Sequence, residues 1–176
     1  MSEPDNAKDP VLEWWRENIA DRDSGHARAL SARLRRADAA GVLTEPQVHR
    51  LAKRLRIGPA RAGELVRLVQ VLAHVRSDHS QSLAQRLGGS EPTMSQLRFQ
   101  RLLRTDTAGL AEALRRALAM VDRTCNVRDL SWVVRLWEQP EQGDAVRARW
   151  AFDYFDSPRP VDIDTENTTN NPETEA

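Results

Sequence analysis

Apolar residues recur at helical spacing along almost the whole of this chain, and this pattern limits the folds open to it. In residues 27–37 they stand at positions 27, 30, 34 and 37, and in residues 60–76 at positions 65, 68, 69, 72 and 75. This spacing places them on one face of a helix. Leu and Ala dominate, and the alternation typical of half-buried strands is absent. The sequence therefore predicts an all-α fold.

Residues that favour helix ends mark where these helices begin and stop. Asp9 before Pro10 is typical of an N-cap followed by the first helical residue, and Ser24 is placed to cap the next helix. The segments TEPQ at 44–47 and TMSQ at 93–96 have the spacing of capping boxes. The expected helices cover about residues 9–22, 24–37, 44–56, 60–76, 80–88, 93–104, 107–122, 128–138 and 144–155.

Breaks in the helical pattern at 77–80 and 88–92 are candidate domain junctions. We expect a flexible N-terminus at residues 1–8, then two small helical bundles, at 9–90 and 91–156, joined in one elongated chain. Residues 157–176 are rich in Pro, Asn, Thr and acid. Their apolar surface is too small to offset the entropy lost on ordering, so we expect a disordered acidic tail.

The formal charge of zero conceals a basic middle between two acidic ends. Residues 1–25 carry a net charge of −4, residues 26–155 a net charge of +9, and residues 156–176 a net charge of −5. A basic body is the electrostatic signature of a nucleic-acid partner, because neutralising phosphates releases condensed counterions.

The arginines of the basic body gather on helix faces. Those at 98, 101 and 104 are spaced by three, which keeps them on one side of a helix, where they can follow consecutive phosphates. Nothing beside them resembles an element that reads bases, so we expect sequence-tolerant binding. An ordinary solvated face with salt bridges, for example to Glu112 or Asp122, is the open alternative for each cluster. The candidate nucleic-acid-binding residues are Arg35, Arg36, Arg98, Arg101, Arg104, Arg115, Arg116, Arg147 and Arg149.

Signals of catalysis are missing. The four histidines lack metal-ligand spacing with each other or with Cys125, and there is no glycine-rich phosphate loop. We therefore expect no catalytic residue, no metal and no cofactor. The chain also lacks an apolar run of about 18 residues and a signal-peptide pattern, so we expect a cytoplasmic protein without a membrane partner. The five tryptophans fit either core packing or a base-stacking surface.

Several segments together resemble one known family. They are WW at 14–15, SARLRRA at 31–37, LRFQRLLR at 97–104, LRRAL at 114–118, NVRDL at 126–130 and RARWAFDYF at 147–155. In this order and spacing, over about residues 10–155, they resemble the CasB family, the small subunit of the type I-E CRISPR surveillance complex Cascade.

The resemblance implies an all-helical, non-enzymatic subunit that acts in RNA-guided antiviral defence. Its partners would be a second copy of itself, the backbone and large subunits of Cascade with their guide RNA, and single-stranded and duplex DNA. Its basic faces would hold the target DNA and the displaced non-target strand while the R-loop forms. The basic residues that match the family's segments are the nine arginines named above.

Two other functions stay open on the residues alone. Residues 43–72 can be drawn as a helix-turn-helix with Gly58 in the turn, which would make the chain a transcription regulator. The arginines could instead pair with acidic surfaces of other proteins, which would make it a purely protein-binding helical scaffold.

Overall fold

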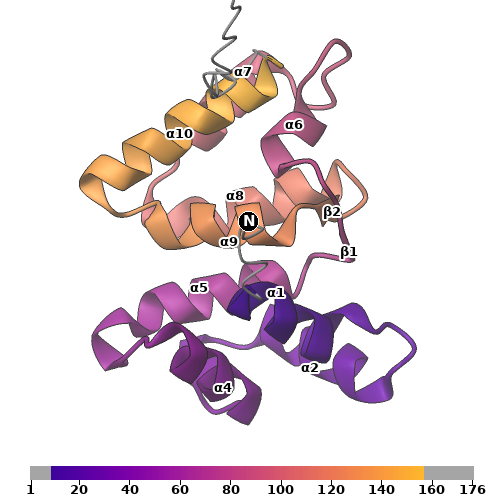
Figure 1. The fold of residues 1–176 in the computed structure, drawn as a ribbon, viewed down its shortest axis with the longest axis vertical. Helices are drawn as coiled ribbons and strands as arrows, with labels where there is room; N and C mark the ends of the chain where they lie inside the picture. Colours follow the sequence, from indigo (N-terminus) through magenta and orange to yellow (C-terminus); the bar gives the residue numbers. More distant parts are fainter. Residues whose placement is uncertain (1–8, 157–176) are drawn as a thin grey trace, which may run out of the picture.

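A computed structural model describes residues 9–156, and helices dominate these residues (Figure 1). The predicted all-α class is confirmed, whereas the predicted flexible N-terminus and acidic tail lie outside the described residues. Two short turns of other helix types accompany the α-helices: a π-helix, η1 (Arg16–Ala20), and a 3₁₀ helix, η2 (Pro59–Arg61). The α-helices are α1 (Pro10–Trp15), α2 (Gly25–Arg36), α3 (Ala39–Leu43), α4 (Pro46–Leu55), α5 (Ala62–Leu72), α6 (Leu83–Leu87), α7 (Gln96–Leu103), α8 (Thr107–Ala119), α9 (Val127–Leu136) and α10 (Pro140–Tyr154).

The caps predicted for the first two helices are confirmed. The carboxylate of Asp9 accepts hydrogen bonds from the amides of Val11 and Leu12, both at 2.9 Å. The hydroxyl of Ser24 accepts one from the amide of Ala27 at 3.3 Å. Each side chain satisfies amides that the first turn of a helix leaves without a partner.

Both predicted capping boxes are wrong. Thr44 ends the short helix α3 instead, and its hydroxyl donates to the carbonyl of Gly41 at 2.8 Å. Thr93 lies outside α7, because buried Met94 follows it and donates its amide to the carbonyl of Leu87 at 3.0 Å. A capping box does form at Ser82, at the start of α6.

The helices form two layers that share one hydrophobic core. Figure 1 shows α1 to α5 in the lower layer and α6 to α10 in the upper layer. Helix α5 lies at the centre, packed against α2, α3 and α4 on its own side and against α8 and α9 across the layers. The buried side chains of both layers belong to a single cluster.

A short parallel ladder also joins the layers. Strand β1 (Ser77–Asp78) pairs with β2 (Thr124–Cys125), in the register of Ser77 opposite Thr124. Backbone bonds from Arg76 to Arg123, at 2.7 Å, and from His79 to Cys125, at 3.0 Å, extend the link. A pair of strands this short has no periodicity to reveal it, so the sequence did not predict it.

Helix α6 packs with the upper layer. We assigned it to the N-terminal bundle, yet its contacts are with α8 and α10. A backbone junction explains this position, because Gly89, at a positive φ of 84°, donates its amide to the carbonyl of Tyr154 at 2.9 Å. A Cβ atom on Gly88 would lie 1.9 Å from that carbonyl oxygen. These contacts favour a division near residues 77–80 over one at 90, and the two-bundle organisation stays a prediction.

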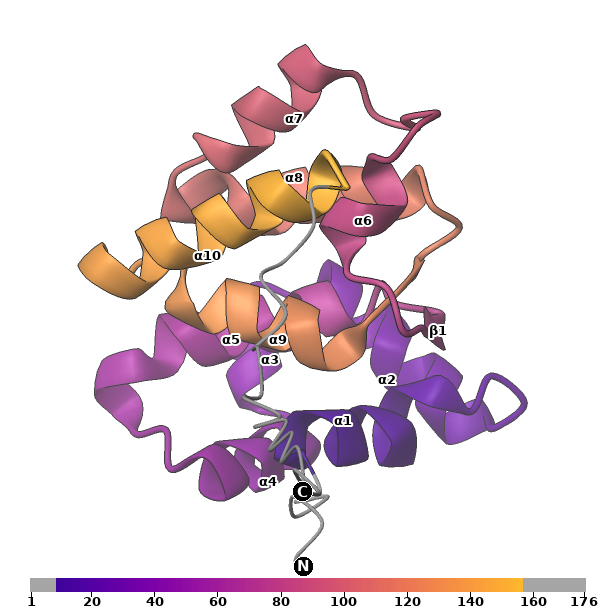
Figure 2. The same cartoon turned by 45° about the horizontal axis from the view of Figure 1, so that its top comes forward.

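Figure 2 shows the far end of the upper layer, where α7 lies beyond α8 and α10. The ring of Phe99 on α7 stacks on that of Tyr154 on α10, with centroids 4.0 Å apart. This contact fixes which face of α7 is turned to the protein. No helix within residues 9–156 combines the length and the apolar character needed to cross a bilayer.

Candidate nucleic-acid interface

The three arginines of α7 lie on its solvent side. Phe99 and Leu102 are buried, and Arg98, Arg101 and Arg104 are exposed, as the helical spacing predicted. Within residues 9–156, the structure records no ion pair for any of the three. Their guanidinium groups are therefore available to an anion, and guanidinium groups fit phosphate oxygens with paired hydrogen bonds.

The arginines of α7 and α8 meet at a surface groove between these helices. The groove has a volume of about 380 Å³, and we call it the α7–α8 groove. Arg104 is not among its lining residues, although it lies directly after α7. The groove is lined by Met94, Arg98, Arg101, Leu102, Thr105, Ala113, Arg116 and Met120.

A carboxylate on α8 partly neutralises the next two candidates. Arg115 donates two hydrogen bonds to Glu112, at 2.7 and 2.6 Å, and Arg116 donates one at 2.8 Å. The bond from Arg115 is the main reason why the pKa of Glu112 is lowered to about 2. Glu112 is therefore ionised at any physiological pH, and this group of three side chains carries one net positive charge.

Arg147 points into the protein, so the prediction that it faces outward is wrong. Its side chain is 28% exposed and donates to the carbonyls of Leu103 and Trp137, both at 3.1 Å. Its guanidinium also lies 4.3 Å from the centre of the Trp137 ring. Arg147 thus fastens the middle of α10 to the residue after α9 and to the end of α7.

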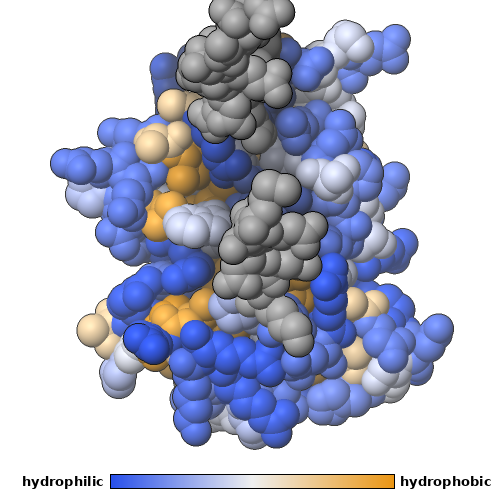
Figure 3. All heavy atoms as spheres, in the orientation of Figure 1, coloured by the Kyte–Doolittle hydropathy of each residue, from blue (hydrophilic) through white to orange (hydrophobic). Residues whose placement is uncertain are grey.

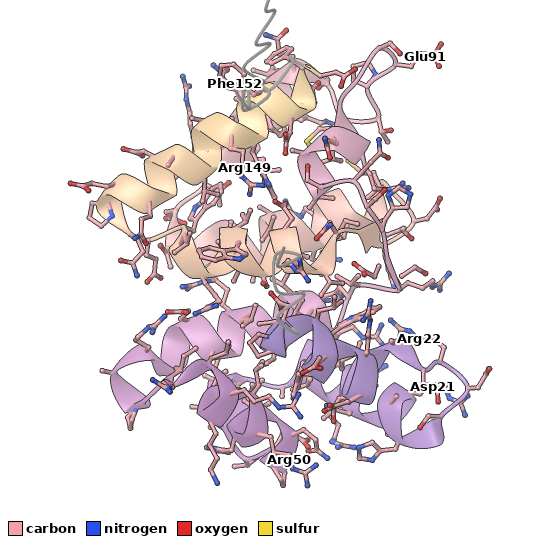
Figure 4. All side chains as sticks on the ribbon, viewed as in Figure 1. Asp21, Arg22, Arg50, Glu91, Arg149 and Phe152 are labelled. Atoms are coloured by element: carbon pink, nitrogen blue, oxygen red, sulfur yellow. The ribbon has the colours of Figure 1, made fainter. Side chains whose placement is uncertain are left out.

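Arg149 is likewise part of the packing between helices. Figure 4 shows it reaching from α10 toward α9, where it pairs with the carboxylate of Asp129. The other oxygen of Asp129 accepts a hydrogen bond from the indole of buried Trp150 at 3.1 Å. Contact of Arg147 or Arg149 with DNA stays a prediction. The hydrogen bonds and ion pair described here hold helices of the protein together.

Arg35 and Arg36 sit near the end of α2, and neither has a recorded ion pair with a described residue. The pKa of Arg35 is lowered, first by burial and then by the charges of Arg123 and Arg36. A positive neighbour from the loop after α8 therefore lies beside α2. Arg123, Arg22 and Arg76 are not among the nine candidate arginines, because each ends or directly follows an expected helix and has an aspartate next to it or two residues away.

Helix α8 connects the arginines of the two layers. The pKa of His74, after α5, is lowered to about 4 by burial and then by the charges of Arg35 and Arg123. The charge of Arg115 acts in the same direction, and that of Glu112 in the opposite one. The charges of Arg115 and Glu112 therefore act on a residue at the junction of the layers, whereas Arg116 lines the α7–α8 groove. Helix α8 thus contributes charge to both places.

The described residues hold little that could do chemistry. Cys125 is buried, and burial is the main cause that raises the pKa of its thiol to about 12. A thiol with this pKa is a poor nucleophile at neutral pH. No group of three or more His, Cys, Asp and Glu side chains within residues 9–156 is placed to hold a metal ion.

The tryptophans are mostly core residues. Trp14, Trp137 and Trp150 are at most 1% exposed, and Trp15 is 3% exposed. Trp132 differs, with 51% exposure, so it alone among these five can offer a ring to a base or to a partner.

A comparison with models of protein families assigns the chain to a family. A family model described as CRISPR-associated protein Cse2 matches residues 30–155. The chain belongs to the Cse2 family. Cse2 and CasB name the same family, so the resemblance seen in the motifs is confirmed. Neither the curated proteins nor the solved structures gave a match.

Cse2 proteins are non-catalytic subunits of CRISPR Cascade. Several residues of the motifs that resembled the family prove to be core contacts in this chain. Asp129, in NVRDL, binds Arg149 and Trp150, in RARWAFDYF. Phe99, in LRFQRLLR, stacks on Tyr154 of that same segment. These motifs therefore specify how α7, α9 and α10 pack.

Proposed function

We propose that this Cse2 protein holds DNA by its sugar–phosphate backbone and stabilises the displaced non-target strand and the target duplex during R-loop formation in antiviral defence. The observation that carries this proposal is the α7–α8 groove, where Arg98, Arg101 and Arg116 converge from two helices. Arg98 and Arg101 have no recorded ion pair within the described residues. Arg104 adds positive charge directly after α7, and Arg35 and Arg36 add it near the end of α2.

Holding a strand can decide the outcome of R-loop formation. Guide–target pairing exchanges one duplex for another at nearly balanced free energy, so a modest gain from strand binding favours the open state. Each neutralised phosphate contributes to binding and makes it more sensitive to salt. Contacts to the sugar–phosphate backbone carry no sequence information, so the proposal predicts sequence-tolerant binding.

Protein partners are part of the proposal. They are the backbone and large subunits of Cascade with the guide RNA, and a second copy of this chain, all in the cytoplasm. Exposed apolar side chains support protein contacts at two places. Figure 3 shows hydrophobic patches in an otherwise hydrophilic face. One place is a surface cavity of about 460 Å³ between α9 and α10, which is lined in part by Trp132, Leu136 and Val146. The other place is a surface groove of about 560 Å³ between α7 and α10, where Leu97 and Phe155 are each more than half exposed.

The helix-turn-helix alternative conflicts with the position of α5. This helix would be the one to enter a major groove, and a reading helix needs an exposed face. Gly63 is the only fully exposed residue within Ala62–Leu72, and most of the others are buried. Helix α5 is the central core helix and has no face to offer to DNA.

A pure protein scaffold is the remaining alternative, and nucleic-acid retention separates it from a DNA clamp. The scaffold predicts no retention of single-stranded DNA on a filter at low or moderate salt. The clamp predicts retention that weakens as salt rises.

The proposal is tested by strand opening in an assembled Cascade complex. Substituting Arg98, Arg101 and Arg104 with Gln should reduce target-dependent opening. The matched control removes the same charge from α4 and the residue after it, where Arg50, Lys53 and Arg56 are exposed and have no recorded ion pair among the described residues. Opening that is unchanged in the α7 variant, or equally reduced in both variants, contradicts a strand-holding role for α7.

A further inference from the structure

Four arginines from separate segments meet where the two layers join. Arg22 follows η1 and Arg35 lies in α2, both in the lower layer. Arg76 follows α5, and Arg123 follows α8 in the upper layer. We call these four residues the junction cluster. Figure 4 shows Arg22 at the edge of the lower layer that faces the upper one.

Backbone hydrogen bonds hold three of the four segments together. The Arg22 guanidinium donates to the carbonyl of Val75 at 2.8 Å, directly before Arg76. The amide of Arg76 donates to the carbonyl of Arg123 at 2.7 Å. The positive charges of Arg35, Arg76 and Arg123 all act to lower the pKa of Arg22, after burial as the main cause. The four side chains therefore share one region, fixed by the junction between the layers.

The backbone at Arg123 is strained. Asp122 and Arg123 both have positive φ, at 54° and 57°, which side chains other than glycine rarely adopt. Two such residues in succession cost free energy, and they persist only where surrounding contacts fix them. Here the amide of Arg123 is bonded to the carbonyl of Leu118 at 2.8 Å. The turn aims a fourth guanidinium at a region that already holds three.

No carboxylate balances this charge within residues 9–156. The nearest in sequence are Asp21, Asp23, Asp78 and Asp122, and none has a recorded ion pair with the cluster, since Asp78 pairs with Arg16 at 3.7 Å. Asp21 instead accepts hydrogen bonds from the amides of Asp23 and Ser24, at 3.0 and 3.2 Å. In addition, the Nε atom of Arg22 is buried and has no hydrogen-bond partner among the described residues. Buried donors are normally satisfied, so this nitrogen, beside three other guanidinium groups, is free to donate to an anion.

We propose that the junction cluster is a binding site for a phosphate oxyanion that bridges the two layers of helices. Arginine forks match the oxygens of a phosphate, and a dianion among four guanidinium groups removes their mutual repulsion. The ligand is a backbone phosphate of a nucleic-acid strand or free phosphate. This site lies outside the α7–α8 groove and stands on its own contacts, so it can fail or hold independently of the proposed function.

Thermal unfolding of the full chain tests the site with inorganic phosphate as the probe. At constant ionic strength, about 20 mM phosphate in place of chloride should raise the melting temperature by about 3–6 °C, and the rise should saturate. The variant Arg22→Gln/Arg123→Gln should lose this rise. Because Arg22→Gln also removes the hydrogen bond to Val75, the rise of each variant is measured from its own melting temperature in chloride. Arg76→Gln, at an exposed side chain, is a second variant that should reduce the rise.

The matched control is Arg50→Gln/Lys53→Gln, which removes the same charge from α4 and should keep the full rise. A thymidine oligonucleotide then separates the two sources of phosphate. Weaker oligonucleotide binding by the Arg22/Arg123 variant supports a backbone phosphate, and unchanged binding together with a lost phosphate response supports free phosphate. An equal phosphate response in the wild type, the cluster variants and the control overturns the proposal.

Discussion

Replacing Glu112 with glutamine should strengthen DNA binding. Glu112 holds Arg115 and Arg116 by three hydrogen bonds, and Arg116 lines the α7–α8 groove. Because the pKa of Glu112 is about 2, the substitution removes a full negative charge at neutral pH. Glutamine keeps nearly the same shape and releases two guanidinium groups to bind phosphates.

The size of the effect follows from the number of guanidinium groups released. Each phosphate neutralised on a single strand adds about 0.7 to the slope of log affinity against log salt. One or two new phosphate-binding groups therefore steepen the slope by about 0.7–1.4, and raise the ratio of affinities at about 50 and 200 mM salt by about 3- to 7-fold.

Fluorescence anisotropy with a labelled thymidine oligonucleotide, titrated at several salt concentrations, measures this slope. Glu91→Gln is the matched control, since Glu91 is exposed on the loop between α6 and α7 and has no recorded ion pair among the described residues (Figure 4). A Glu112→Gln slope equal to that of the wild type, or equal to that of Glu91→Gln, refutes the view that Glu112 restrains a phosphate-binding surface.

Three further predictions concern the framework, each measured as the free energy of unfolding in urea. Burial and nearby arginines lower the pKa of His74 to about 4, so the folded chain binds fewer protons than the unfolded chain between that pH and about 6.5. The free energy of unfolding should therefore fall by roughly 1–2 kcal/mol as the pH drops through this window, since the group is only partly buried. The variant His74→Gln should show a smaller fall. Asp129→Ala leaves the indole of Trp150 without its acceptor and should cost about 2–3 kcal/mol; an unchanged stability would contradict the structural role of this carboxylate. Gly88→Ala should lower the free energy of unfolding by more than about 2 kcal/mol, because its Cβ would lie 1.9 Å from a carbonyl oxygen of α10. Gly63→Ala has open space around it and should stabilise the fold by about 0.5–1 kcal/mol. Equal effects of the two substitutions would be inconsistent with the packing described.

The helices were predictable because their signals are local. Apolar spacing indicated α2 and α8 nearly in full, and Asp9 and Ser24 marked two helix starts correctly. The predicted capping boxes failed at Thr44 and Thr93, since a Thr and a Gln at the right spacing do not reveal a preceding short helix or a buried Met94. The β1–β2 ladder joins two segments that lie far apart in the chain, and no local pattern encodes it.

The candidate interface was predictable only in part. Spacing tells which residues share a helix face but not what stands opposite that face. The face of α7 meets solvent, so Arg98 and Arg101 are exposed as expected. Helix α10 is covered on several sides, so Arg147 and Arg149 are bonded within the protein.

The junction cluster was not predictable from local patterns. Arg22 and Arg76 end expected helices and Arg123 directly follows one, each with an aspartate within two residues, and no local pattern shows that they meet. Tertiary contacts bring the three guanidinium groups together while the aspartates pair elsewhere or face solvent. Net charge by segment indicated a basic body, and only the fold shows where the charge concentrates.

The salt dependence of single-strand binding by the full chain tests the central claim most directly. Replacing Arg98, Arg101 and Arg104 with Gln should make the plot of log affinity against log salt shallower by about 2 units of slope. The variant with Gln at 50, 53 and 56 should keep a slope close to that of the wild type. If the slope falls equally in the two variants, net charge alone governs binding, and α7 does not grip the strand.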